Sequence, residues 1–281
     1  AMMTELMTRV RQLTDEVGRK RGRPILIAMR VPDSVEYCRA IGLDLEKWLA
    51  GDLLDLLVVS SYFQLNEWEY SVALGHKYGV KVYPSLDESR VADEAARTMR
   101  VSLLAYRGRA ADVWAAGADG VYLFNAFDPQ DPLWREMGDP KVLAKLDCDY
   151  FGSTRGSVRA NGGNLPIGPY QKIETLNPAN PKTVRPGESQ TAKLRAGAGF
   201  KPGEKVQLTL RLQLDRPVEP GAVEVTLNGQ AVKLEPAEKR WLRGPVGTEQ
   251  VRAGINTVTL KPGPSVSKSL KWQDLVLEVR H

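Results

Sequence analysis

A change in hydrophobic pattern near residue 150 is the feature that most constrains the fold. Before it, helical and strand patterns alternate; from about residue 190 onward, short strands are separated by Pro- and Gly-containing turns. Alternating strands and helices are typical of a parallel sheet covered by helices, whereas evenly spaced short strands are typical of an antiparallel sandwich. We therefore expect two kinds of architecture within the 281 residues.

Four strand-helix units are predicted before residue 150. The strands are expected at 25–31, 55–63, 80–86 and in the apolar run that follows the Gly-Ala-Asp-Gly turn at 117–120. Asp33 or Ser34 is expected to cap the helix after the first strand, and Asp44 the next helix. A first helix precedes them all, because apolar residues recur there every three or four positions, at Met3, Leu6, Val10, Leu13 and Val17.

The second part of the chain is predicted to be all-β. Residues 151–189 are rich in Gly, Pro, Asn and Ser and are expected to form a surface connection. Residues 190–281 alternate apolar and polar positions, and Asn228-Gly229 is a strong signal for a two-residue hairpin. We predict a partial (β/α) barrel over 1–150, the connection over 151–189, and a jelly-roll or immunoglobulin-like β-sandwich over 190–281.

The first part also resembles a known family. The segments "RGRPILIAMRVPDSVEYCRAIGLDLEKWL", "GDLLDLLVVSSYF", "ALGHKYGVKVYPSLDES" and "GADGVYLFNAF" resemble the second half of glycoside-hydrolase-like proteins with a (β/α)8 barrel. The resemblance covers roughly residues 4–150, and in that family a β-sandwich follows the barrel. It implies a protein that acts on an oligo- or polysaccharide and needs no cofactor. It names neither the sugar nor the linkage.

The expected barrel is incomplete. A closed barrel of this type has eight strands, and the four units encoded here correspond to the last four. An open half-barrel exposes two sheet edges and an apolar inner face. We expect a homodimer joined along the exposed sheet, with hydrolysis if the second copy completes the site. The alternatives are a half-barrel covered by the connection or the sandwich, a non-catalytic carbohydrate-binding or scaffold protein, and an inactive fragment of a larger glycosidase.

Catalytic candidates are the carboxylates expected at the carboxyl ends of the strands, where βα barrels carry their chemistry. Glycoside hydrolysis needs two carboxyl groups. Asp87 or Glu88 is the first choice for one, because in the resembling barrels this strand supplies the nucleophile. Adjacent side chains diverge at a strand end, so these two are not the pair.

The second carboxyl group is expected from Glu67, from Asp128 or from another subunit. Structural roles compete with all four assignments. Asp87 or Glu88 is equally suited to capping a helix. Asp128 precedes Pro129 and is favoured as a turn former, and Glu67 is favoured as a first-turn residue stabilised by the helix dipole.

Substrate-binding candidates share the same expected rim. Aromatic faces stack on pyranose rings, while carboxylates and amides bond to sugar hydroxyls. Arg30 is the most informative, since a charge that ends an apolar strand needs either a ligand or a neighbouring carboxylate as a structural partner. The full set is Arg30, Asp33, Ser61, Tyr62, Asn66, Asn125, Phe127 and Trp134.

Composition limits other chemistry. Cys38 and Cys148 form neither a metal-binding spacing nor a disulfide framework, and the only histidines are His76 and His281. The net charge is +5, and the one dense basic cluster, at 19–24, is interpreted as a solvated helix end. No apolar run approaches the ~20 residues of a membrane span, and no signal-peptide pattern is present. We expect a soluble chain that binds no metal, nucleic acid or membrane.

Overall fold

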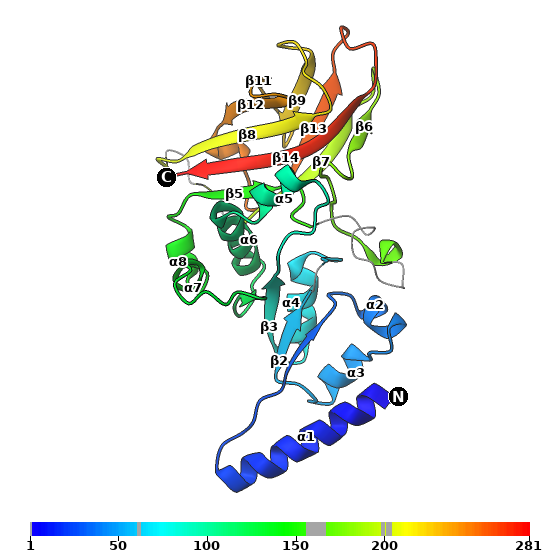
Figure 1. Cartoon of the computed structure of the whole chain (residues 1–281), viewed down its shortest axis with the longest axis vertical. Helices are drawn as coiled ribbons and strands as arrows, with labels where there is room; N and C mark the ends of the chain where they lie inside the picture. Colours follow the sequence, from blue (N-terminus) through cyan, green and yellow to red (C-terminus); the bar gives the residue numbers. More distant parts are fainter. Residues whose placement is uncertain (1, 61–62, 156–166, 198–199, 201–203) are drawn as a thin grey trace. The chain divides into compact units, whose positions relative to one another are not determined.

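The computed structural model consists of two compact units (Figure 1). It describes residues 2–60, 63–155, 167–197, 200 and 204–281, so the expected binding residues Ser61 and Tyr62 lie outside the described residues. The chain passes back and forth between the units. Unit 1 contains Ala1–Asp87, Ala116–Ala126 and Gly163–Ile173, and unit 2 contains Glu88–Ala115, Phe127–Gly162 and Glu174–His281.

Unit 1 is built on a four-stranded parallel sheet whose strands pair in the order in which they occur in the sequence. A strand lies within each of the four predicted segments: β1 (Ala28–Val31), β2 (Leu56–Val59), β3 (Lys81–Leu86) and β4 (Tyr122–Leu123). The helices of this unit are α1 (Met2–Arg21), α2 (Val35–Ala40), α3 (Leu45–Ala50) and α4 (Trp68–Lys77), with a 3₁₀ turn at Gly168–Tyr170. As predicted, Asp44 caps α3; Ser34, and not Asp33, caps α2.

The two faces of this sheet have different environments. On one face, α4 lies directly on the strands, because a Cβ added at Gly75 would be 2.2 Å from Val82 Cγ2. Leu57 and Val82 are fully buried there. The other face carries Arg30 and Tyr83, which are both in register with Val58 of the central strand β2. Tyr83 remains half-buried, so this second face is less completely covered.

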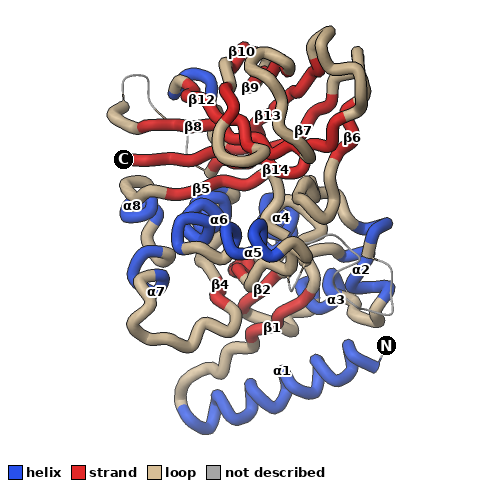
Figure 2. The backbone as a smooth tube through the Cα atoms, turned by 45° about the horizontal axis from the view of Figure 1, so that its top comes forward, coloured by secondary structure: helices blue, strands red, loops and turns tan. Residues whose placement is uncertain are grey.

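Helix α1 packs through a face other than its apolar stripe. Its buried residues are Thr4, Met7 and Gly18. Trp48 of α3 donates its indole N–H to the Thr4 hydroxyl at 3.0 Å, and Figure 2 shows α1 beside α3. Leu6 and Leu13 of the predicted stripe are 50% and 60% exposed. The predicted apolar stripe lies one residue before the buried positions in the sequence. One residue corresponds to a rotation of about 100° around a helix.

The Gly-Ala-Asp-Gly turn before β4 has a structural role. The Asp119 carboxylate accepts hydrogen bonds from the Val82 backbone N–H and the His76 ring, both at 2.8 Å. Gly117 has a φ of +82°, and a Cβ at Gly120 would be 2.6 Å from the Tyr83 ring. These residues therefore fasten the start of β4 to β3.

The start of β2 is fastened to β1 in a similar way. Asp55 accepts a hydrogen bond from the Ile27 backbone N–H at 2.7 Å and from Arg11 of α1 at 2.8 Å. In both cases, an aspartate in the loop before one strand accepts a hydrogen bond from a backbone N–H at or just before the start of the neighbouring strand. Because the chain enters each strand from a loop, these bonds fix the register of the parallel sheet at its amino end.

Unit 2 contains two antiparallel sheets. One has the order β10-β9-β13-β7, and the other has the order β11-β12-β8-β14-β5, with β6 also paired to β14. Its helices are α5 (Glu94–Arg100), α6 (Leu103–Ala115), α7 (Leu133–Glu136) and α8 (Pro140–Leu143), with a 3₁₀ turn at Thr248–Gln250. The strands are β5 (Cys148–Phe151), β6 (Lys182–Val184), β7 (Gln190–Ala196), β8 (Gln207–Leu214), β9 (Val223–Leu227), β10 (Gln230–Val232), β11 (Glu235–Pro236), β12 (Trp241–Val246), β13 (Gly254–Pro262) and β14 (Leu270–Arg280).

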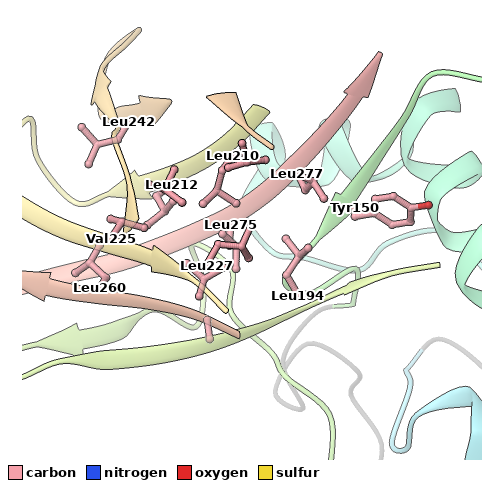
Figure 3. Packing of buried hydrophobic residues seen from close by; sticks show 14 of the residues in the cluster. Tyr150, Leu194, Leu210, Leu212, Val225, Leu227, Leu242, Leu260, Leu275 and Leu277 are labelled. Atoms are coloured by element: carbon pink, nitrogen blue, oxygen red, sulfur yellow. The ribbon is translucent and has the colours of Figure 1, made fainter. Parts of the chain in front are cut away.

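Alternating apolar residues of these sheets form one large core, part of which is shown in Figure 3. Leu210, Leu212 and Leu275 are fully buried in it. The predicted hairpin at Asn228-Gly229 is confirmed: it joins β9 to β10, and both residues have positive φ. The segment 151–189 is not wholly a connection, since its strand β6 pairs with β14 and buries Val184.

Helix α6 belongs to unit 2 and packs closely against β5 and the end of β7. A Cβ added at Gly108 of α6 would be 2.3 Å from the Asp149 carbonyl oxygen of β5. A Cβ at Gly197, just after β7, would be 2.3 Å from the Ala111 backbone of α6. Both glycines are therefore required for the backbones to approach. Although α5 and α6 connect β3 to β4 along the chain, they are structural parts of unit 2.

Among the described helices, none combines the length and the apolar content needed to cross a bilayer.

A buried ion pair attaches α5 to β14. The Arg100 guanidinium binds both carboxylate oxygens of Asp274, at 2.9 and 2.6 Å, and both side chains are fully buried. Arg100 also donates to the Ser153 carbonyl at 2.6 Å, which draws in the segment after β5. Removing one partner of such a pair leaves an uncompensated buried charge.

Replacement of Asp274 by Asn is expected to destabilise the protein by about 3–5 kcal/mol, because the Arg100 charge loses its partner in a site without solvent. Equilibrium unfolding in urea measures this loss. Replacing both residues with apolar ones, as R100M together with D274L, is expected to recover much of it. As a control, E235Q removes a carboxylate from the exposed pair Lys233–Glu235 and should cost less than about 1 kcal/mol. A cost for D274N as small as that of E235Q would contradict this prediction.

Asp119 is expected to make the stability of the protein depend on pH. Burial opposes its ionisation, but the Val82 N–H, His76 and Lys81 outweigh that effect and hold the Asp119 pKa below 3.8. A lowered folded-state pKa gives stability that is present above pH ~4 and is lost as the pH falls through the folded-state pKa. D119N should therefore cost about 1–2 kcal/mol at pH 7 and progressively less toward acid. Urea unfolding from pH 7 to 2.5 tests this, with the exposed D52N as the control. A D119N loss that stays constant with pH would rule the mechanism out.

Candidate functional site

The carboxyl ends of three strands of unit 1 bring a charged and aromatic cluster together. Arg30 comes from β1, Ser85 and Asp87 from the end of β3, and Phe124 follows β4. Arg30 Nη1 lies 3.6 Å from Asp87 Oδ2, and the guanidinium carbon lies 3.8 Å from the centroid of the Phe124 ring. The Ser85 hydroxyl donates to Asp87 Oδ1. We call these four residues the Arg30 cluster.

The Arg30 cluster connects the two edge strands of the sheet. Arg30 lies on β1, and Phe124 directly follows β4, so their contact spans the carboxyl end of the sheet. In open α/β sheets, ligands bind outside the carboxyl ends of the strands.

Exposure within the cluster is uneven. The Asp87 side chain is fully buried, whereas the Arg30 side chain is 28% exposed. The buried carboxylate thus pairs with the guanidinium, and the Phe124 ring makes a cation–π contact with it. Arg30 is expected to need either a carboxylate partner or a ligand. It has the carboxylate partner, and part of its side chain still faces solvent.

Asp33 and Asn66 hold the loop that follows β2. The Asp33 carboxylate accepts hydrogen bonds from the backbone N–H groups of Leu65 and Asn66, each at 2.9 Å. The Asn66 side-chain amide in turn donates to the Asp33 carbonyl at 2.6 Å. Asp33 is 2% exposed. These two predicted binding residues therefore contact each other. Their hydrogen bonds fix the backbone at Leu65 and Asn66, in the segment between β2 and α4 that we call the rim loop.

Aromatic residues that the sequence did not single out lie beside this loop. Tyr37 of α2 makes edge-on contacts with Phe63 and Tyr170, with ring centroids 5.6 and 5.3 Å apart. The Lys172 N–H donates to the Leu65 carbonyl at 2.7 Å, so the segment around 170 pairs with the rim loop. Tyr37 lies in an ordinary amphipathic helix, and Tyr170 is about 130 positions away in the sequence, so no local pattern indicates their contact.

Glu67 and Asn125 complete the predicted residues of unit 1. Glu67 occupies the position before the first turn of α4, is half-buried, and makes no side-chain capping bond. Asn125 is exposed and has a φ of +56°. The Cys38 thiol is also buried in this unit, and its burial raises its pKa to about 12, which suits a packing residue and not a nucleophile.

The remaining predicted residues belong to unit 2. Glu88 is exposed, and its side chain and that of the buried Asp87 face different surroundings, as expected for neighbours at a strand end. Asp128 accepts a hydrogen bond from the Gln130 N–H, and its carbonyl accepts one from the Trp134 indole at 2.7 Å. Asp128 and Trp134 thus stabilise a turn together. Phe127 is 84% exposed.

The described residues contain no group of three His, Cys, Asp or Glu side chains placed to hold a metal ion. Of the predicted site residues that the structure describes, six belong to unit 1 and four to unit 2. Those in unit 1 are Arg30, Asp33, Asn66, Glu67, Asp87 and Asn125, and those in unit 2 are Glu88, Phe127, Asp128 and Trp134.

Comparisons with known proteins found no matching family model and no matching curated protein. Among solved structures, BuGH86 in complex with neoagarooctaose gives a TM-score of 0.29 at 14% identity, over 39% of this chain and 21% of that one. BpGH86A, a β-porphyranase of glycoside hydrolase family 86 from the human gut bacterium Bacteroides plebeius, gives a TM-score of 0.29 at 11% identity, over 90% of this chain and 62% of that one.

A Paenibacillus cycloisomaltooligosaccharide glucanotransferase complexed with cycloisomaltoheptaose gives a TM-score of 0.23 at 10% identity, over 82% of this chain and 36% of that one. The chain thus spans less than two thirds of the length of each of these proteins. With TM-scores of 0.23–0.29, these likenesses do not assign this chain to a family or an activity.

Proposed function

We propose that the chain is a glycoside-hydrolase-like protein that binds carbohydrate at the carboxyl edge of the unit 1 sheet without hydrolysing it. The observation that supports this proposal is the Arg30 cluster. A partly exposed guanidinium stands at the carboxyl end of a parallel sheet, with a buried carboxylate and an aromatic ring holding it in place. The resemblance of the segments over 4–150 to glycoside-hydrolase-like proteins supports carbohydrate as the ligand class.

The cluster suits the recognition of hydroxyl or acidic groups on a sugar. A guanidinium has five N–H donors in a fixed plane, and Asp87 faces only part of it. Because Asp87 and Phe124 already fix the side chain, a ligand would bind without paying much of the usual cost of ordering it. The exposed amide of Asn125, directly after Phe124, adds a further donor and acceptor on the same strand end.

The burial of the candidate carboxylates favours binding over hydrolysis. Hydrolysis requires two carboxyl groups that reach the scissile bond from both sides. Asp87 is fully buried against Arg30, and Asp33 uses its carboxylate to bind two backbone N–H groups. In unit 2, Asp128 is committed to a turn. Of these bonds, the turn at Asp128 is the structural role that the sequence set against catalysis.

Hydrolysis is the second candidate, and one feature favours it. Asp87 directly follows β3, while Glu67 follows β2, the adjacent strand, and is half-buried. Carboxylates after neighbouring strands are suitably placed to approach one substrate. Under this candidate, a homodimer that completes eight strands would add the missing groups, and Asp87 would have to become accessible.

Arg30→Lys is expected to weaken carbohydrate binding at least about tenfold, because lysine keeps the charge beside Asp87 but loses the planar fork and its stacking on Phe124. A glycan array that includes neoagarooctaose, isomaltooligosaccharides and uronic-acid oligomers would identify ligands, and calorimetry would measure affinity. Arg39→Lys, on an exposed arginine of the same unit, is the matched control and should leave affinity unchanged. A folded R30K variant with undiminished affinity, or a wild-type chain that binds no glycan, would overturn the proposal.

Mass spectrometry of the same oligosaccharides after incubation separates the two candidates. The binding proposal expects no shortened products from the wild type. Products whose rate falls about a hundredfold or more in Asp87→Asn or Glu88→Gln, but not in the control Asp52→Asn, would instead favour hydrolysis through paired carboxylates.

A further inference from the structure

Helix α1 presents an apolar seam that is largely exposed. Five residues recur at spacings of three, four, three and four; Leu6 and Leu13 are at least half exposed, and Val10 between them is half-buried. We propose that this seam is a self-association surface, on which α1 of a second copy of the chain packs in antiparallel orientation. The residues of this α1 seam are Met3, Leu6, Val10, Leu13 and Val17.

The spacing of the α1 seam is that of a helix pair. Its average of 3.5 residues gives a narrow stripe typical of a coiled coil, whereas a helix on a globular core buries a wider one. The core-facing side of α1 is already taken, since Thr4, Met7 and Gly18 are its buried residues. The seam is therefore a second, separate face, and it is long enough for several apolar layers along a partner helix.

Charges beside the seam favour α1 of a second copy as the partner. Arg9 and Glu16 occupy equivalent positions, each one residue before a seam valine. When two copies run antiparallel, Leu6 lies opposite Val17, and Val10 lies opposite Leu13, which gives four apolar layers. In this register, Arg9 of each copy lies beside Glu16 of the other. The register one heptad away would place Arg9 against Arg9, so charge selects the first.

Both charged residues are available for these pairs. Arg9 now contacts Glu5, and Glu16 contacts Lys20, within α1, and all four side chains are more than half exposed. Exposed pairs four residues apart on a helix are weak, so exchanging them costs little. The new pairs would lie at the edge of apolar layers, where they also fix register.

The ends of α1 favour the antiparallel orientation. Its last turn carries Arg19, Lys20 and Arg21, and its first turn carries Glu5. Parallel packing would align two macrodipoles and bring two basic ends together, whereas antiparallel packing places each basic end beside the amino-terminal half of its partner.

Sedimentation velocity over a range of concentrations tests the proposal. The wild type is expected to shift from a mass of 31.1 kDa toward twice that value as concentration rises. The double variant Leu6→Glu with Leu13→Glu should stay monomeric, because it places four carboxylates in the apolar layers. Both leucines are exposed, so the fold should persist, which circular dichroism checks. Val142→Glu, at an exposed valine of α8 in unit 2, is the matched control and should associate like the wild type.

Charge exchange tests the register and the orientation. R9E alone and E16R alone should each raise the dimer dissociation constant about tenfold, since each turns two attractions into two repulsions. The combined variant R9E with E16R should return to within about threefold of the wild type, because antiparallel pairs are restored. In a parallel pair, Glu16 would instead face Arg21, and the combined variant would stay weak. The exchange R39E with E46R, on an exposed pair of unit 1, is the control.

Three results would overturn the proposal. The first is a wild type that remains monomeric up to its solubility limit. The second is a dimer that the double glutamate variant leaves intact. The third is a combined charge exchange that fails to restore association, which would reject the antiparallel register.

Discussion

The buried pair between Arg100 and Asp274 is the interaction on which much of unit 2 depends. A charge inside a protein must find a partner, and this guanidinium meets both oxygens of one carboxylate and a backbone carbonyl. The pair joins α5 to β14 and to the segment after β5. Helix α6 follows directly and packs on β5 through Gly108. The segment between β3 and β4 is thereby held as part of an antiparallel unit.

The parallel sheet of unit 1 is held together by contacts other than those of α5 and α6. In a (β/α) repeat, the helix between two strands usually covers their own sheet. Here α5 and α6 form part of unit 2, and the parallel strands are held together by other means. Asp55 and Asp119 fasten strand starts through backbone N–H groups, and α4 packs closely on β3 through Gly75. On the face of the sheet that carries Arg30, this side chain is left partly exposed.

Burial also changes the roles of the candidate site residues. The sequence offered Asp87 or Glu88 as a reacting group, but the buried position of Asp87 beside Arg30 makes it a positioning residue in the proposed site. The partly exposed side chain is the arginine. Asp33 and Asn66 similarly bond to each other and shape the rim loop. The proposed binding function follows from this exchange of roles, because a positioned guanidinium recognises a ligand but does not cleave a glycosidic bond.

The sequence by itself determined the local features of this protein. Hydrophobic periodicity located a strand in each of the four expected segments, and Asn228-Gly229 fixed the hairpin between β9 and β10. Residue type placed one cap at Asp44 and limited the other to Asp33 or Ser34, of which the structure uses Ser34. Each of these depends on residues close together in the chain. Tertiary structure alone decided that Arg30 meets Asp87 and Phe124, and that Arg100 binds Asp274, 174 positions away. It also decided which face of α1 is buried. These outcomes depend on which distant segments exclude water from one another, and no local spacing encodes that.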